Sequence, residues 1–323
     1  MQSLYYHVSK FGIKGGLLAA LFWAGVAGLT ARAELPPVVI DAGNPQSAPG
    51  KLSVQEAQTY FGKIFTNPIS VETDEKVPAA VVLGTPASNP LIRSMAQSGD
   101  LVLPHGPNAD QGYSIKTIGG VIYVAGSTEI GTLYGLYALL EDYGAYFQIS
   151  GDALPDRAAF TPKDLNVSLS PVFKYRGLMP WDNFLCGGSG YNEEDWQALI
   201  MRATRMKLNK LDLHFYPGYV YYNEIWDGQA VPPKFAAQPN DFAPQGKPGA
   251  KAFGDTQLFC VRNWEDNKAD PLQQAESSQA MMRRIIDYSH DRGWSVVAGF
   301  ALMQSRSADF IKTQRAAICT KAE

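Results

Sequence analysis

The sequence predicts an α+β domain followed by an α/β region with about three βα units. In the first half of the chain, strand-like and helix-like segments are mixed without strict alternation, which is typical of a small layered α+β domain. From about residue 173 the pattern changes to strand, helix, strand, helix, strand, which predicts parallel strands with helical crossovers. The composition agrees, because 46% hydrophobic residues can form a core, while 30 Gly and 21 Pro indicate many turns.

The first 33 residues have the pattern of a secretory signal peptide. Lys10 and Lys14 form a basic start, residues 17–30 are apolar, and Ala31-Arg32-Ala33 supplies a small-x-small cleavage pattern. The apolar run is shorter than the about 20 residues that a spanning helix needs, so we expect no stable membrane span after signal removal. The alternative is an uncleaved N-terminal anchor. We expect a secreted or periplasmic protein whose mature chain begins at Glu34.

An α+β accessory domain is predicted over residues 34–165. Ser53 is a candidate N-cap for its first helix, and a second helix is predicted from about Ser127 to Tyr143. Two alternating runs around Gly119-Gly120 predict a hairpin, because glycine accepts positive φ. The predicted strands are 36–40, 69–72, 79–83, 113–117 and 121–125.

Residues 166–323 form the second region, entered through a connector at 155–171. Asn192 is a candidate N-cap with Asp195 three residues on, and a later helix begins at Asp270-Pro271 and ends at Gly293. Between the second strand and this helix lies a proline-rich insertion, residues 216–269, which we expect to form a site wall or lid; the alternative is a neutral spacer. The predicted strands are 173–179, 210–215 and 295–302.

Charge and cysteine usage exclude several classes of function. A net charge of −3 argues against a nucleic-acid binder, which needs a basic face. The three cysteines are widely spaced, and no His/Cys cluster has zinc spacing, so we expect no metal and no cofactor. Either Cys186 and Cys260 form a bridge, or the cysteines are buried free thiols.

Aromatic and polar side chains gather just after the predicted strands of the second region. Trp181 and Tyr216 follow the first and second strands, and Asp182 and Asn183 are interspersed with them. Rings can cover the apolar face of a pyranose while amides and carboxylates bind its hydroxyls, so these residues predict a carbohydrate site. For three other aromatics we expect burial in the core: Phe173, Tyr175 and Trp196.

Two further residues are candidates for sugar binding. Arg176 lies inside an apolar strand, where an unpaired charge is costly, so it should reach either a ligand or Asp212 as a structural partner. His214 ends the second strand, so it either faces the carboxyl edge of the sheet or is a core histidine.

Catalytic residues stay unassigned at this point. A glycosidase needs two carboxylates at a suitable separation, and Asp182, Glu224 and Asp227 are available. The chain has no phosphate-binding loop, no dinucleotide fingerprint, no HExxH and no GxSxG motif.

Two parts of the chain resemble known glycosidases. The segments 111–116, 122–126 and 131–141 resemble the α+β N-terminal domain of glycoside hydrolase family 20, and a related domain precedes the barrel of α-glucuronidases. The first two barrel strands of family 20, whose arginine and histidine bind the terminal sugar, are similar to Arg176-Gly177-Leu178-Met179 and to residues 206–214. Trp181-Asp182-Asn183 is similar to a segment of the α-glucuronidases, whereas residues 298–302 replace the acidic and Pro-Gly-His residues of family 20.

The resemblance implies a (β/α)8 barrel of the TIM type after the accessory domain. Residues 173–323 number 151, whereas a whole barrel takes about 250. We therefore expect an incomplete barrel that lacks the catalytic carboxylates of a parent enzyme that hydrolyses terminal O-glycosidic bonds. The alternative is a non-catalytic carbohydrate-binding or scaffold protein. The expected substrate-binding residues are Arg176, Trp181, Asp182, Asn183, His214 and Tyr216.

Overall fold

A computed structural model describes residues 35–73, 78–180, 191–215, 225–226, 229–230 and 271–300. The chain divides into two units, Met1–Glu34 and Leu35–Glu323, and every described residue belongs to the second. The predicted signal peptide therefore lies outside the described residues.

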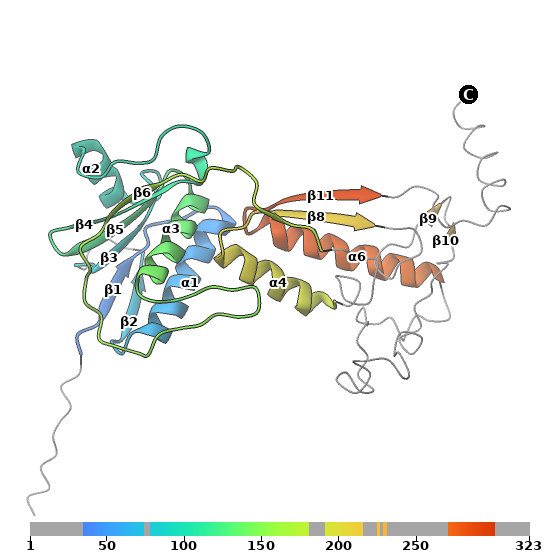
Figure 1. The fold of residues 1–323 in the computed structure, drawn as a ribbon, viewed down its shortest axis with the longest axis horizontal. Coiled ribbons are helices and arrows are strands. Elements are labelled where there is room, and N and C mark those ends of the chain that lie inside the picture. Colours follow the sequence, from blue (N-terminus) through green and yellow to red (C-terminus); the bar gives the residue numbers. More distant parts are fainter. Residues whose placement is uncertain are drawn as a thin grey trace, which may run out of the picture. The chain divides into compact units, whose positions relative to one another are not determined.

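A six-stranded mixed sheet forms the centre of the accessory domain (Figure 1). Its strand order is β2-β1-β3-β5-β4-β6, with β2, β1, β3 and β5 parallel and β4 and β6 antiparallel to their neighbours. The predicted mixture of strands and helices is confirmed, as is the hairpin around Gly119 and Gly120, which have φ of 59° and 83°. The strands are β1 (Val38–Asp41), β2 (Ile69–Glu72), β3 (Val81–Gly84), β4 (Tyr113–Ile118), β5 (Val121–Gly126) and β6 (Asn166–Leu169).

Helices cover both faces of this sheet. On one face α1 (Ala48–Ile64) and α3 (Glu129–Asp142) bury a large core with alternate strand residues such as Val81 and Leu83. On the other face α2 (Pro90–Ser98) packs on the intervening residues, among them Val82 and Tyr123. This alternation is what a strand buried on both faces requires.

Three glycines, Gly126, Gly131 and Gly135, allow α3 to approach the sheet closely. A Cβ at Gly131 would overlap the carbonyl oxygen of Gly112, and a Cβ at Gly126 would overlap backbone atoms at the start of α3. A Cβ at Gly135 would lie 2.8 Å from Cγ1 of Val124. These positions therefore require glycine, because the helix backbone lies too close to the strands for a side chain.

Two helix starts differ from the sequence predictions. The prediction of Ser53 as the N-cap of α1 is wrong, because α1 begins at Ala48 and the Ser47 side chain accepts a hydrogen bond from Gly50 N. The Glu129 carboxylate accepts from the backbone of Gln46 and Ser47, which places a negative charge at this helix N-terminus. We did not predict α2 from the sequence, although Asn89 and Pro90 form a standard start signal.

The connector contributes a strand to the first sheet. β6 pairs antiparallel with β4, so the sheet of the accessory domain extends to Leu169, past the predicted boundary at residue 165. A short 3₁₀ helix, η1 (Ala109–Gln111), precedes β4 and contacts the segment that follows β6.

A second, three-stranded sheet has the order β11-β8-β7, and all its pairs are parallel. Its elements are β7 (Gly177–Leu178), α4 (Glu193–Arg205), β8 (Lys210–Phe215), α6 (Pro271–His290) and β11 (Ser295–Phe300). The predicted capping box of Asn192 and Asp195 is present at the start of α4. The predicted βα alternation with parallel strands is thus confirmed for these elements.

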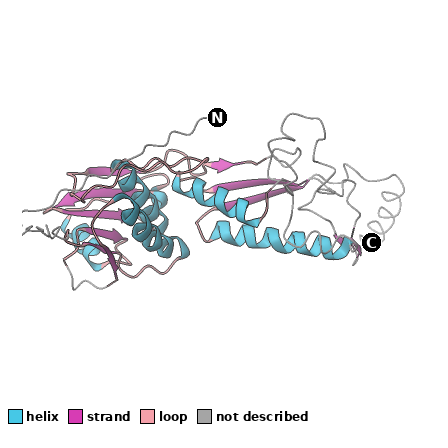
Figure 2. Ribbon diagram, turned by 90° about the horizontal axis from the view of Figure 1, so that it is seen from below, coloured by secondary structure: helices cyan, strands magenta, loops and turns pink. Residues whose placement is uncertain are grey.

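Both α4 and α6 lie on one side of this sheet (Figure 2). Their apolar residues pack with Leu211 and Leu213 of β8, and Trp196 is buried as predicted. The prediction that Phe173 and Tyr175 are core residues is wrong, because their side chains are 71% and 53% exposed. They precede β7 rather than belonging to it. In the insertion 216–269, β9 (Ile225–Trp226) pairs with β10 (Gln229–Ala230).

Candidate functional site

The carboxyl ends of β7, β8 and β11 lie at one edge of the second sheet, because the three strands are parallel. Leu178 of β7 is paired with Leu211 of β8, and His214 near the end of β8 is paired with Gly299 of β11. In parallel β/α arrays, ligands bind at this edge. His214 lies near the carboxyl end of its strand as predicted, and its ligand-binding role stays a prediction.

The two faces of β8 differ in character. Leu211 and Leu213 are buried against the helices, so Lys210 and Asp212 belong to the opposite face, where their side chains form an ion pair at 2.9 Å. By the same alternation, position 214 belongs to the face of β8 that carries Lys210 and Asp212.

The accessory domain contacts the amino ends of the same strands. Arg205 and Lys207 precede β8, and they form ion pairs with Glu56 and Glu141 of the accessory domain. At the start of β11, a Cβ on Gly293 would lie 2.8 Å from Cδ1 of Ile130 of α3. These contacts occupy the edge opposite to the candidate site.

Arg176 also lies at the amino edge, immediately before β7. Its guanidinium donates to Lys207 O, to Oε1 of Gln111 and to Phe173 O, at 2.7–2.9 Å. The expected structural partner, Asp212, is paired with Lys210 instead, so that prediction is wrong. The physical reason is that Arg176 lies outside the strand and reaches the carbonyls of Lys207 and Phe173 and, on the accessory domain, Gln111. A sugar-binding role for Arg176 stays a prediction.

The remaining predicted site residues are not placed. Trp181, Asp182, Asn183 and Tyr216 lie outside the described residues, as do Glu224 and Asp227. For His214 the backbone is described but the side chain is not. The cysteines Cys186, Cys260 and Cys319 also lie outside the described residues.

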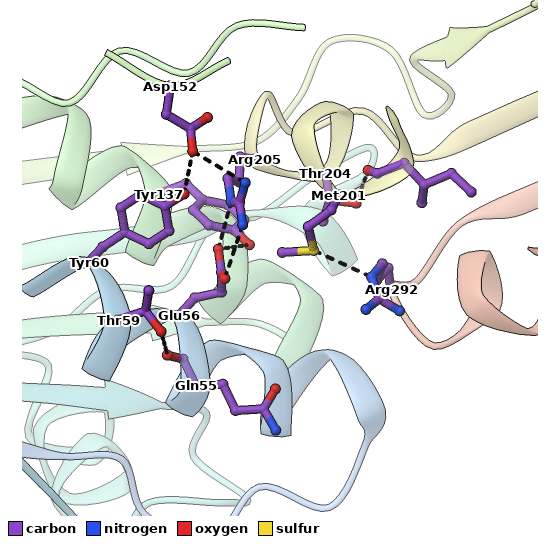
Figure 3. Close-up of polar contacts among 11 residues, drawn as sticks. Gln55, Glu56, Thr59, Tyr60, Tyr137, Asp152, Met201, Thr204, Arg205 and Arg292 are labelled. Carbon is purple, nitrogen blue, oxygen red and sulfur yellow. Dashed lines mark hydrogen bonds and ion pairs between the residues drawn. The ribbon is translucent and has the colours of Figure 1, made fainter. Parts of the chain in front are cut away.

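A second polar cluster, which sequence reasoning missed, joins the accessory domain to α4 (Figure 3). Arg205 donates to Oε2 of Glu56 at 2.9 Å and to Oδ2 of Asp152 at 3.2 Å. Tyr137 donates to Glu56 at 3.1 Å, and Tyr60 donates to Asp152. The only sequence signal is the basic last turn of α4, with Arg202 and Arg205, and the favourable interaction of these charges with the helix dipole already accounts for it.

The charges in this cluster have protein partners. Burial alone would lower the pKa of Arg205, but the hydrogen bond and charge of Glu56, together with Tyr60 and the charge of Asp152, outweigh it and raise that pKa above its usual range. Burial and the hydrogen bond to Asp152 raise the pKa of Tyr60. A neighbouring arginine, Arg292, lies over the Tyr288 ring and donates to Met201 Sδ at 3.4 Å. The arrangement is structural, since its acids and bases are paired with each other.

Within the described part of the chain, no group of three or more His, Cys, Asp or Glu residues could hold a metal ion. No helix in that part is long and apolar enough to cross a membrane.

No family model matches the chain, and no curated protein matches it in sequence. Several solved structures that the chain is similar to are glycoside hydrolases. One is a GH138 enzyme targeting the pectin rhamnogalacturonan II, with 14% identity and a TM-score of 0.50 over 87% of this chain and 33% of that chain.

Two other similar structures are hexosaminidases. The β-N-acetylhexosaminidase from Bacteroides fragilis is 17% identical, with a TM-score of 0.47 over 87% of this chain and 44% of that one. A mutant Streptomyces plicatus β-hexosaminidase in complex with its product GlcNAc is 16% identical, with a TM-score of 0.47 over 81% and 41%. The chain thus spans less than half the length of these structures. The likeness to the GH138 enzyme is one of fold, a mixed α/β architecture, and the resemblance to α-glucuronidases stays a prediction.

Proposed function

We propose that this chain is part of an exported glycoside hydrolase-like protein of carbohydrate metabolism. Its sugar site lies at the carboxyl ends of β7, β8 and β11. The observation that carries the proposal is the register of the second sheet, in which His214 and Gly299 are paired at that edge while the accessory domain contacts the opposite one.

The sequence around this edge supports a sugar as the ligand. Trp181-Asp182-Asn183 follows the end of β7, and Tyr216 directly follows the last residue of β8. An aromatic ring can cover the apolar face of a pyranose, and the amide and carboxylate can bind its hydroxyls. The fold likeness to a glycoside hydrolase agrees with this chemistry.

The proposed reaction class is hydrolysis of a terminal O-glycosidic bond. Such hydrolysis uses either two carboxylates or one carboxylic acid with a nucleophilic substrate group. We assign no catalytic carboxylate in this chain, and Asp182, Glu224 and Asp227 are the candidates to test first.

The experiment tests the purified protein and five variants against a panel of aryl glycosides and pectic or chitin-derived oligosaccharides. We expect saturable sugar binding that is lost in Trp181→Ala and in His214→Ala. Hydrolysis that is abolished in Asp182→Asn, Glu224→Gln or Asp227→Asn would identify an enzyme and its carboxylate. Saturable binding without hydrolysis would favour a non-catalytic carbohydrate-binding protein, and no binding of any sugar would overturn the proposal.

A further inference from the structure

A strap of six residues, 171–176, connects β6 of the first sheet to β7 of the second. Its side chains make little contact with the core, since Val172 and Phe173 are 86% and 71% exposed. Its backbone is nevertheless held, because its first four carbonyl groups all accept hydrogen bonds from side chains. Asn108 Nδ2 donates to the carbonyls of 171 and 172 at 3.0 and 3.2 Å.

The other two carbonyls are held by a hub of three polar side chains, of which Gln111 and Asn209 are buried and Arg176 is partly buried. Arg176 donates to Phe173 O at 2.7 Å, and the carbonyl of residue 174 accepts from Gln111 at 3.0 Å and from Asn209 at 2.8 Å. Oε1 of Gln111 in turn accepts from Arg176 at 2.9 Å and from Asn209 at 3.0 Å.

Burial makes this hub costly to disturb. Gln111 and Asn209 are only 7% and 5% exposed, and Oδ1 of Asn209 accepts from the backbone N–H of Arg176 at 2.8 Å. A buried amide that loses its partner leaves an unsatisfied polar group. Gln111, Arg176 and Asn209 come from three separate segments of the sequence, and the hub brings them together at the point where the chain enters β7.

β7 itself contributes little to its own register. It pairs with β8 at two positions, Gly177 with Lys210 and Leu178 with Leu211, and it is the edge strand of its sheet within the described residues. A slip of one residue would turn every side chain of the strand to the opposite face. The register therefore needs support from outside the strand.

We propose that Gln111 and Asn108 are positioning residues of the accessory domain, which hold the strap and so set the register of β7 on β8. The strap and its hydrogen bonds do not depend on what the protein binds. The consequence for sugar binding rests on the proposed function, because Trp181-Asp182-Asn183 follows β7 and would shift with it.

The test is limited trypsin digestion of the folded full chain, with cleavage after Lys174 and after Arg176 quantified by mass spectrometry. We expect Gln111→Leu and Asn108→Gly to accelerate cleavage at these bonds by about tenfold, which corresponds to about 1.4 kcal/mol. Glycine suits position 108, where φ is 59°, so this variant removes the amide without backbone strain.

Two variants serve as controls. Gln111→Glu keeps an oxygen that accepts from Arg176 and Asn209 but loses the amide that donates to the carbonyl of residue 174, so we expect it to accelerate cleavage by less than Gln111→Leu does. Tyr143→Phe removes a hydrogen bond to Thr161 O at 2.8 Å, which holds the connector but not the strap, so we expect cleavage within about twofold of the wild type.

Unchanged cleavage in both Gln111→Leu and Asn108→Gly would overturn the proposal, as would an equal acceleration in Tyr143→Phe. If Gln111→Leu does not fold, the Asn108→Gly result alone tests the proposal, because the Asn108 side chain that this variant removes donates to two strap carbonyls. Sugar binding, measured separately on the same proteins, tests the proposed function. Absence of sugar binding would therefore count against the proposed function, whereas unchanged cleavage would count against the role of Gln111 and Asn108.

Discussion

Replacing Arg205 by methionine should strongly destabilise the folded protein. Arg205, Glu56 and Asp152 are only 17%, 9% and 16% exposed, and the methionine would leave both carboxylates without their cationic partner. Oδ1 of Asp152 already has no hydrogen-bond partner among the described residues. Removing one partner of a buried ion pair costs about 3–5 kcal/mol, because the remaining charge is buried without compensation.

The assay is thermal and urea unfolding followed by circular dichroism. At about 2–4 °C per kcal/mol, Arg205→Met should lower Tm by about 6–20 °C. The double variant with Glu56→Gln should lose less than the sum of the single losses, by about 1–3 kcal/mol, because the glutamine removes one of the uncompensated charges.

The matched control is Arg284→Met. Arg284 is 55% exposed and pairs with Glu193 at 2.7 Å, and exposed pairs contribute about 0–1 kcal/mol. If Arg205→Met costs no more than Arg284→Met, the cluster in Figure 3 does not hold the accessory domain to α4, and our reasoning is refuted.

Three further predictions follow from the structure. Burial raises the pKa of Tyr113 and Tyr134 to about 12, above the 10.0 of the unfolded chain, so their stabilisation is full below pH 10 and is lost toward pH 12. We expect cooperative unfolding in that window by circular dichroism, and ionisation of every tyrosine near pH 10 without unfolding would contradict this. Gly131→Ala should abolish folding or cost several kcal/mol, whereas Gly62→Ala, in an exposed helical position with open space, should stabilise by about 0.5–1 kcal/mol in the same melts. Mass spectrometry of the exported protein should find an N-terminus at Glu34, and a retained Met1 would argue against a cleaved signal.

Local patterns in the sequence predicted most of the described elements. The glycine pair at 119–120 gives the β4–β5 hairpin, and the capping box at Asn192 gives the start of α4. These features depend on neighbours in the chain, so the sequence shows them directly. The N-cap of α1 was harder, because the Glu129 carboxylate that completes it is 82 residues away from Ser47.

The contacts between the accessory domain and the second sheet could not be predicted. Glu56 and Arg205 are 149 residues apart, and the sequence does not show that α1 and α4 lie together. Phe173 and Tyr175 look like strand residues in sequence, but the carbonyls of the strap face polar donors, and their side chains are exposed. The register of His214 with Gly299 likewise came only from the structure, although the strands themselves were predicted.

The most direct test of the proposed sugar site compares two aromatic residues at opposite ends of β7. Sugar binding is measured by calorimetry with the wild type, with Trp181→Ala beyond the carboxyl end of the strand, and with Tyr175→Ala before its amino end. We predict saturable binding that is lost in Trp181→Ala and retained in Tyr175→Ala, whose ring is exposed at the edge that the accessory domain contacts. Binding that is lost in Tyr175→Ala but retained in Trp181→Ala would contradict a site at the carboxyl edge.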